Sequence, residues 1–511
     1  MGMKLICKRI DSWPKLTWGA KILANSNVIE IIHGPSVEDH EDWVVEGCWT
    51  GVFEDGGFDQ TDLIFGSGIR IRNEKVVFVS SGSTLDRLWW KQDKNEAIIS
   101  NSLPAFLCLS RLDFLNDYNY SAAVGSIRLG LDHYQRVLPL SDGDINVLYY
   151  HNLIWDGLIL KEQPKPYSSD EFLSFEDYES YLNENARALK KNAASKKRKI
   201  NVSVLSTVSQ GYDSLLSTVL AKNHMGCRQT VTIKESSSLW RGSDSGKKIA
   251  ECLGIECVEY KRKIGFVSDE VFFWAVAGRA MELNMAQFDY PEPLCLFLTG
   301  FHGDTVWGTD SRYISNPFLS PSVAGMGISE YRLIRGIFHC PVPYWGIRHF
   351  PAIQKISKSS EMEPWSIGGS YDRPIPRRIV EEAGVPRQLF GQIKKNTQIP
   401  PYLLWPYSRI AQNSAYSYAQ KNHFFAPSSF IVKLWRPLAQ LDRLVYKNIT
   451  ERLGMPEIKW PWSRLNDQNI LFQWANSVLR DRLSDSLTSH DINTGENKKK
   501  AKKRYEYRLP I

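Results

Sequence analysis

One short polar turn in the middle of the chain carries residue types that suit phosphate binding. An apolar, β-branched run begins at Val202 and leads into the turn 209–214, SQGYDS, after which leucine and valine recur at helical spacing. A strand, a tight turn and a helix in succession point backbone N–H groups and the positive end of a helix dipole at an anion. Gly211 lets the backbone approach a phosphate closely, and Ser209 and Ser214 supply hydroxyl donors. We therefore interpret this turn as a phosphate-binding loop.

Two aspartates near predicted strand ends indicate a metal ion at the same place. Asp213 lies within the turn, and a carboxylate beside a polyanion requires a cation between the two. A second apolar run, 294–299, ends at Gly300 and is followed by Asp304 among small residues. One magnesium ion that bridges ATP phosphates requires carboxylates placed in this way. We predict Asp213 and Asp304 to be magnesium ligands.

The elements that must position these residues follow a βαβαβ order. After the loop helix come a β-branched strand at 229–233, a short helix at 246–253 and a third strand at 255–260. This order predicts a parallel, doubly wound sheet in which ligands bind at the carboxyl ends of the strands. Residues 1–150 contain short apolar runs separated by turn residues, which is typical of a β sandwich or layered sheet. The expected fold class is α+β followed by α/β.

The length of 511 residues allows two or more domains. We predict a β-rich layered domain over 1–165, a second domain with the parallel sheet and a helical carboxy-terminal part over 166–484, and a basic tail over 485–511. The net charge of +7 is concentrated in short lysine and arginine runs. Such runs are typical of solvated surfaces, so we do not expect nucleic acid to be the partner.

The remaining bulk features favour a cytoplasmic protein. No run of apolar residues is long enough for a transmembrane helix, and the first residues lack the apolar core of a secretory signal. Eight cysteines are scattered along the chain without a CxxC pair or zinc-ligand spacing. We therefore expect reduced thiols, no membrane partner and no cysteine–histidine metal cluster.

The two loops resemble known motifs. Residues 209–214 resemble the pyrophosphate loop, S-G-G-x-D-S, of the ATP pyrophosphatase superfamily and depart from it at Gln210. A serine- and glycine-rich turn of any α/β domain is the alternative for this motif alone. Residues 299–308, TGFHGDTVWG, resemble the S-G-E-G-x-D-E-x-F-G-G motif of asparagine synthetases. The resemblance implies that the backbone around Val208 and Ile233 recognises adenine, and that Thr299 and Gly300 line the nucleotide.

A third segment is similar to the K-x-G-F-x-x-P region of the same synthetases. Lys394 takes the place of its lysine, positioned by Pro400, while Asn396 and Thr397 replace Gly-Phe. In that family the lysine faces the reaction centre, where a cation stabilises charge on the α-phosphate and on the tetrahedral intermediate. The resemblance thus implies that Lys394 is catalytic. An exposed Lys-Lys pair is the alternative, and Lys395 is expected to have no role.

The amino-terminal region is similar in order and spacing to the glutaminase domain of asparagine synthetases. The similarity covers residues 45–53, 63–66, 86–90 and 98–103. That glutaminase requires a leading cysteine whose thiol attacks the amide. Here the sequence starts Met1-Gly2-Met3, and the first cysteine, Cys7, lies inside a predicted strand. We predict a degenerate domain of the Ntn amidotransferase type without glutaminase activity, with Cys7 as a core thiol.

The resemblance implies an AMP-forming amide ligase that uses ATP and Mg²⁺. A carboxylate attacks the α-phosphorus, pyrophosphate leaves, and an amine attacks the acyl-adenylate. An inactive glutaminase beside such a site is the pattern of β-lactam synthetases and lasso-peptide cyclases, so small-molecule or peptide substrates would supply both groups. Phe301 and Thr305 replace carboxylates of the family motif, which argues against aspartate as substrate. The alternatives are an enzyme acting on tRNA or a sugar acid and an inactive ATP-binding scaffold. A homodimer is left open.

Overall fold

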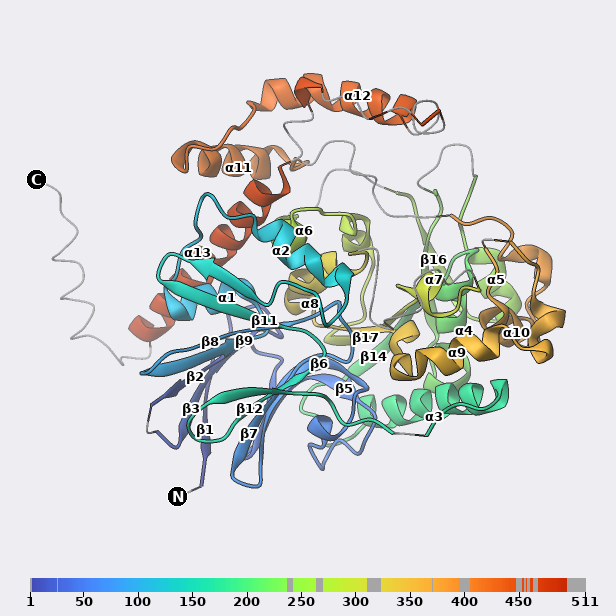
Figure 1. Cartoon of the computed structure of the whole chain (residues 1–511), viewed down its shortest axis with the longest axis horizontal. Helices are drawn as coiled ribbons and strands as arrows, with labels where there is room; N and C mark the ends of the chain where they lie inside the picture. Colours follow the sequence, from blue (N-terminus) through green and yellow to red (C-terminus); the bar gives the residue numbers. More distant parts are fainter. Residues whose placement is uncertain are drawn as a thin grey trace, which may run out of the picture.

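The computed structural model describes residues 2–24, 26–168, 170–236, 242–262, 270–309, 323–369, 371–395, 405–446, 453–454, 456, 460–462 and 467–493. They form a mixed α/β protein with a β-rich amino-terminal region and a separate parallel sheet of five strands (Figure 1). The expected fold class is confirmed at this level. The assignments to an amidotransferase type and to a pyrophosphate-loop type stay predictions.

Two β-sheets face each other in the amino-terminal region. The first has the order β1-β3-β2-β9-β8-β11-β10, and the second has the order β13-β12-β7-β6-β5-β4. Side chains that alternate along the strands, such as Trp18 and Ile31 of the first sheet and Ile69 and Phe78 of the second, pack between them. The predicted layered arrangement is therefore confirmed. The strands are β1 (Lys4–Arg9), β2 (Trp18–Leu23), β3 (Val28–His33), β4 (Glu38–Asp39), β5 (Trp43–Trp49), β6 (Ile64–Arg72), β7 (Lys75–Val79), β8 (Leu88–Gln92), β9 (Glu96–Ser100), β10 (Val137–Leu140), β11 (Gly143–Leu148), β12 (Asn152–Trp155) and β13 (Leu160–Gln163).

The parallel sheet has the strand order β16-β15-β14-β17-β18. In chain order these are the third, second, first, fourth and fifth strands, so the winding reverses between β14 and β17. Open α/β sheets bind ligands at such a reversal, outside the carboxyl ends of the strands. Both predicted loops follow these two strands. The strands are β14 (Val202–Thr207), β15 (Gln229–Ile233), β16 (Glu256–Tyr260), β17 (Leu294–Thr299) and β18 (Ile337–Pro341), and all four pairings are parallel.

Helices cover the sheets and connect the strands of the parallel sheet. Helix α5 ends at Gly254, whose φ of 63° is the left-handed cap that the sequence predicts. Helix α3 begins after a capping box formed by Ser174 and Asp177. The helices of the first part of the chain are α1 (Leu103–Ser110), α2 (Tyr120–Gly125), α3 (Phe175–Ala193), α4 (Tyr212–Met225), α5 (Lys247–Leu253) and α6 (Val271–Ala277).

The carboxy-terminal part is helical, as predicted. Helix α13 packs against α1 and α6 and continues past residue 485 to Asn493, so the first residues of the predicted basic tail belong to this helix. Residues 494–511 lie outside the described part of the chain. Among the helices described, none is long and apolar enough to cross a membrane. The later helices are α7 (Gly303–Val306), α8 (Ser329–Arg335), α9 (Phe350–Ser357), α10 (Pro374–Glu382), α11 (Arg409–Lys421), α12 (Ser429–Val445) and α13 (Gln468–Asn493).

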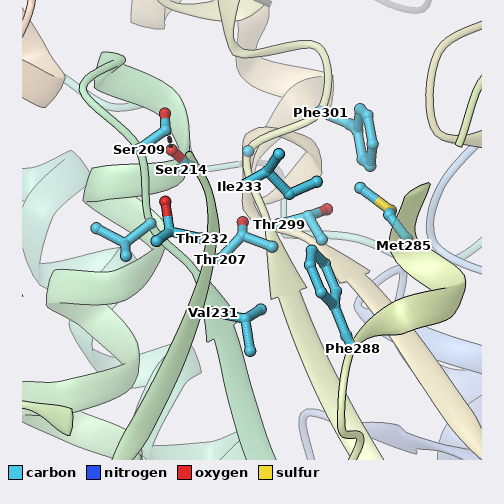
Figure 2. A pocket seen from close by; sticks show the side chains of 12 residues that line it. Thr207, Ser209, Ser214, Val231, Thr232, Ile233, Met285, Phe288, Thr299 and Phe301 are labelled. Atoms are coloured by element: carbon cyan, nitrogen blue, oxygen red, sulfur yellow. Dashed lines mark hydrogen bonds between the residues drawn. The ribbon is translucent and has the colours of Figure 1, made fainter. Parts of the chain in front are cut away.

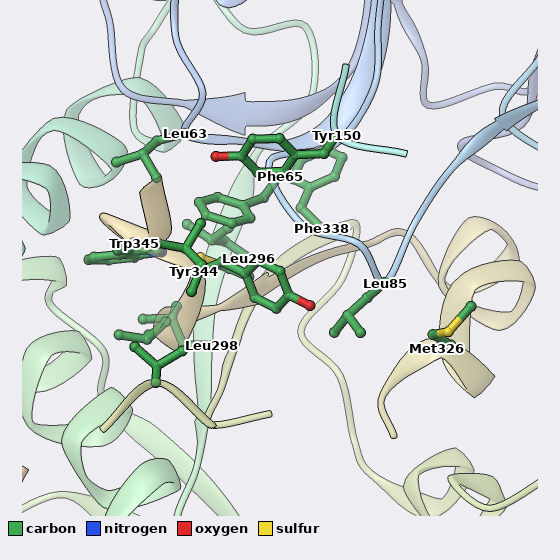
Figure 3. Close-up of a cluster of buried hydrophobic side chains, with 14 of the residues drawn as sticks. Leu63, Phe65, Leu85, Tyr150, Leu296, Leu298, Met326, Phe338, Tyr344 and Trp345 are labelled. Atoms are coloured by element: carbon green, nitrogen blue, oxygen red, sulfur yellow. The ribbon is translucent and has the colours of Figure 1, made fainter. Parts of the chain in front are cut away.

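The amino-terminal region and the parallel sheet share one hydrophobic core. Figure 3 shows Phe65 and Tyr150 of the first region among Leu296 and Trp345 of the second. The rings of Phe65 and Trp345 have centroids 6.3 Å apart. A shared core of this kind fixes the parallel sheet against the amino-terminal strands.

A buried ion cluster also joins the two regions. Arg332 of α8 lies 2.7 Å from a carboxylate oxygen of Glu46 on β5 and 2.9 Å from one of Asp86. All three side chains are almost entirely buried. Removal of one partner would leave an uncompensated charge in the interior, which is strongly destabilising.

Candidate functional site

The turn after β14 holds its two serine hydroxyls together at the start of α4. Ser209 Oγ and Ser214 Oγ share a hydrogen bond of 2.8 Å, and the amide of Gly211 donates to Ser209 Oγ at 3.1 Å. Gly211 is the extended residue that precedes the first turn of α4. The predicted phosphate-binding residues therefore surround the amino-terminal end of a helix of 14 residues, where the helix dipole favours an anion.

Two glycines allow the turn after β17 to pack directly against this loop. A Cβ atom on Gly300 would lie 2.3 Å from the carbonyl carbon of Asp213 and 2.4 Å from the nitrogen of Ser214. A Cβ atom on Gly303 would lie 2.4 Å from Cγ of Asp213. A Cβ atom at either position would force atoms of Asp213 or Ser214 to shift. The close approach brings Asp213 and the residue after Gly303, Asp304, into one neighbourhood.

Each predicted metal ligand pairs with a basic side chain. The guanidinium of Arg373 donates to the carboxylate of Asp213, and Lys394 Nζ lies 3.0 Å from Asp304 Oδ2. The Arg373 side chain is 5% exposed, whereas that of Lys394 is 57% exposed. The structure thus places the predicted catalytic lysine beside a predicted metal ligand. Arg373 was not predicted; it directly precedes α10, which begins at Pro374.

The charges of Arg373, Lys394 and the two aspartates affect the pKa values of Asp213 and Asp304. Burial raises the pKa of Asp213, the Arg373 guanidinium opposes this change, and the nearby Asp304 carboxylate raises the pKa further. Burial would also raise the pKa of Asp304, but Lys394 and Arg373 outweigh burial and lower it. Within the described residues, Oδ1 of Asp213 is buried and meets no hydrogen-bond donor. A buried carboxylate oxygen without a donor is a natural ligand for a cation.

A cleft of about 130 Å³ opens at the carboxyl ends of β14, β15 and β17 (Figure 2). In Figure 2 the hydroxyls of Ser209 and Ser214 lie at one end, and Met285 and Phe288 lie at the other. The predicted residues Val208, Ser209, Ser214, Ile233, Thr299 and Gly300 line this cleft, and Gly211 and Asp213 belong to the adjoining turn. The remaining lining residues are Thr207, Val231, Thr232, Met285, Phe288 and Phe301.

Met285 and Phe288 were missed because they come from a short 3-10 helix, Leu283–Gln287, and the residue that follows it. This segment carries no motif, and only the tertiary fold brings it to the cleft. Phe301 was noted as a departure from the resembled motif. Its ring meets that of His339 edge-on, with centroids 5.7 Å apart, and forms an apolar wall.

Thr299 is held in place by a buried histidine. His339 Nε2 lies 2.8 Å from Thr299 Oγ1. Burial lowers the pKa of His339 to about 4, so its ring is neutral at pH 7. The Asp86 carboxylate, which pairs with Arg332, also acts on this ring. The buried ion cluster between the two regions is therefore connected electrostatically to a residue that lines the cleft.

Gln210 and Lys395 connect the loop to the segment that carries Lys394. Lys395 Nζ donates to Oε1 of Gln210 at 2.7 Å, and the amide of Gly391 donates to the carbonyl of Gln210 at 2.8 Å. Gln210, which replaces a glycine of the resembled motif, thus attaches the loop 209–214 to the segment that contains Gly391 and Lys395. Sequence spacing gave no sign of this role for Lys395. The predicted positions Asn396, Thr397 and Pro400 lie outside the described residues.

Comparison with models of protein families gives no match, and no curated protein matches the sequence either.

Proposed function

We propose that this chain is an AMP-forming amide synthetase that adenylates a carboxylate with ATP and Mg²⁺ and transfers the acyl group to an amine. One observation carries the proposal: Asp213, Asp304, Arg373 and Lys394 meet where the strand order of the parallel sheet reverses, next to the hydroxyls of the loop 209–214. Under this proposal the parallel sheet is of the pyrophosphate-loop type, and the amino-terminal sandwich is a degenerate amidotransferase-like domain.

The cleft suits ATP in the order of its chemical groups. Val231, Ile233 and Phe288 offer apolar contacts for a purine ring. Ser209 and Ser214, at the other end, would donate to phosphate oxygens, supported by the dipole of α4. The nucleotide would thus lie across the strand ends with its phosphates toward Asp213.

The residues present fit a magnesium ion. Magnesium is usually held by one or two carboxylates and by substrate phosphates, and Asp213 offers a buried oxygen without a donor among the described residues. Asp213 and Asp304 would hold the ion. Magnesium would neutralise charge on the phosphates as pyrophosphate leaves.

Arg373 and Lys394 would act on the charges that develop during the reaction. A carboxylate oxygen of the substrate attacks the α-phosphorus and the bond to pyrophosphate breaks; the amine then attacks the acyl carbon and AMP leaves. Each cation is now held by an aspartate. When the aspartates turn to a metal, Arg373 and Lys394 become available to the phosphate and acyl oxygens. Once released, the two cations would stabilise the negative charge that develops on these oxygens in the transition state.

The amine would come from the substrate. Cys7 lies inside β1, where its neighbours pair with β3, so it is not placed as an amino-terminal nucleophile. The substrates we propose are a small-molecule or peptide carboxylate and an amine. The eight cysteines are unpaired, which supports a cytoplasmic location as part of the proposal.

Trapping of the acyl group tests the proposal. The protein is incubated with Mg-ATP, hydroxylamine and pools of carboxylic acids and short peptides, and hydroxamate and AMP are measured. We expect one pool to give both products in equal amounts. ATP binding without AMP formation from any pool would favour the inactive scaffold, and AMP formation that requires copurified RNA would favour the tRNA-modifying alternative. Formation of ADP in place of AMP would contradict adenylation.

A further inference from the structure

Three metal-ligating side chains meet at the edge of the amino-terminal sandwich. Cys7 lies on β1, His33 ends the neighbouring strand β3, and Asp39 lies on β4 of the opposite sheet. A ring nitrogen of His33, the Cys7 sulfur and a carboxylate oxygen of Asp39 all lie within 4.8 Å of one another. In the parallel register Cys7 pairs with Ile31 and Arg9 pairs with His33. Cys7 and His33 are therefore diagonal neighbours on the same face of the first sheet.

The protonation of His33 leaves one nitrogen suited to a metal. Its Nδ1 lies 2.8 Å from the carbonyl oxygen of Gly34. A carbonyl oxygen only accepts, so Nδ1 carries the proton and Nε2 carries a lone pair. Nε2 is buried and has no hydrogen-bond partner in the described part of the chain, and His33 is only 2% exposed. Metal-bound histidines commonly donate their other ring N–H to a backbone carbonyl in this manner.

The other two groups supply a sulfur and a carboxylate oxygen. Lys199 Nζ donates to Oδ1 of Asp39 at 2.9 Å, so the carboxylate is oriented by a neighbour, as ligating carboxylates usually are. A metal that binds the Cys7 sulfur would displace the thiol proton.

We propose that Cys7, His33 and Asp39 form a zinc site whose fourth position is open to a water molecule. One sulfur, one nitrogen and one oxygen suit a borderline-soft cation, whereas magnesium and calcium select oxygen ligands. Zinc takes four ligands at about 2.0–2.3 Å in a tetrahedron, so small side-chain movements would bring the three atoms to binding distance. Binding releases the thiol proton to solvent and joins β1 and β3 of the first sheet to β4 of the second. This site is separate from the proposed ATP site.

Sequence spacing concealed this cluster. Zinc motifs are recognised by ligand pairs a few residues apart, whereas these ligands lie at positions 7, 33 and 39 and meet only through strand pairing across two sheets. The expectation of no cysteine–histidine metal cluster followed from spacing alone. The expectation that Cys7 is a core thiol is met only in part, because Cys7 is intermediate in burial.

Cobalt titration of the full-length protein tests the proposal, because Co²⁺ replaces zinc and reports thiolate binding by a charge-transfer band. We expect one equivalent of Co²⁺ to produce this band, and an excess of zinc, but not of magnesium, to abolish it. Cys7→Ala should remove the band and His33→Gln should weaken Co²⁺ binding at least tenfold. Cys252→Ala, which removes an exposed thiol on α5, is the matched control and should bind as wild type does. A band that persists in Cys7→Ala, or no band in wild type, would overturn the proposal.

A second measurement uses only the unmodified protein and so does not depend on the folding of variants. Alkylation of Cys7 and Cys252 is followed by peptide mass spectrometry with and without zinc. We expect zinc to slow the reaction of Cys7 severalfold relative to that of Cys252. Equal protection of both thiols, or protection of neither, would refute a zinc site at Cys7.

Discussion

Replacement of Gly303 by alanine would place a methyl group against Asp213 while leaving both predicted metal ligands in the chain. The added Cβ would lie 2.4 Å from Cγ and 2.5 Å from Oδ1 of Asp213. Ordinary contact begins at 3.4 Å, so the carboxylate must move by about 1 Å (3.4 minus 2.4). This movement would also disturb the contact between Asp213 and Arg373.

The size of the expected losses in stability and in rate depends on which atoms the added methyl group displaces. A side chain can yield more easily than backbone, so the loss of stability should fall near the lower end of the ~1–3 kcal/mol typical of overpacking. A misplacement of about 1 Å at a reacting group costs roughly 10²-fold in rate. Gly300→Ala provides the contrast, because its Cβ would meet backbone atoms of Asp213 and Ser214 at 2.3 and 2.4 Å. We expect Gly300→Ala to lower stability more than Gly303→Ala does.

The assay combines calorimetric titration of Mg-ATP with thermal unfolding monitored by circular dichroism. Gly303→Ala should remain folded, with magnesium-dependent ATP affinity reduced at least tenfold. Gly57→Ala is the control, because its Cβ would meet nothing within 4 Å and its φ is −84°. Wild-type affinity for Mg-ATP in folded Gly303→Ala would refute the argument that Asp213 holds the metal.

Three further predictions concern single side chains. Lys394→Ala should bind ATP normally but lose roughly 10²–10³-fold in the rate of carboxylate-dependent AMP formation, about 3–4 kcal/mol. Lys355→Ala, on the exposed face of α9, should keep the wild-type rate. Equal rates in the two variants would place Lys394 outside the site. Arg332→Ala should lower the free energy of unfolding in urea by about 3–5 kcal/mol, because Glu46 and Asp86 would stay buried without a counter-charge; a loss below about 1 kcal/mol would show that the cluster is solvated. Burial raises the pKa of Glu330 from 4.5 to about 7, so the folded protein binds this proton more tightly and stability falls as pH rises across that interval. Glu330→Gln should remove this pH dependence and raise the free energy of unfolding at pH 8 by about 3 kcal/mol. Urea unfolding of both proteins at pH 5 and pH 8 measures the effect. If the variant's stability changes with pH as much as that of the wild type, the prediction is wrong.

The parallel sheet could be predicted because each of these strands is a short contiguous run of apolar or β-branched residues. Helical patterns separate these runs, which lie at 202–207, 229–233 and 294–299. This alternation of strand and helix favours parallel pairing. The loops could be located for the same reason, since each follows directly from a strand. Gly254 likewise marked the end of α5 through its cap.

The contacts within the site could not be predicted, because they depend on tertiary packing. Arg373 and Lys395 reach the loop 209–214 from segments far along the chain, and their residue types suit many surface positions. Phe288 lines the cleft from a short segment that carries no motif. The need for glycine at position 303 appears only when the two loops are packed together.

Exchange of labelled pyrophosphate into ATP tests the central claim most directly, because it requires reversible adenylation of a carboxylate. Once an accepted carboxylate is known, we expect the wild-type protein to catalyse exchange only when this carboxylate and magnesium are both present. Asp213→Asn and Asp304→Asn, each lacking one metal carboxylate, should lose exchange while remaining folded. Exchange that continues at the wild-type rate in both variants would contradict the assignment of the site.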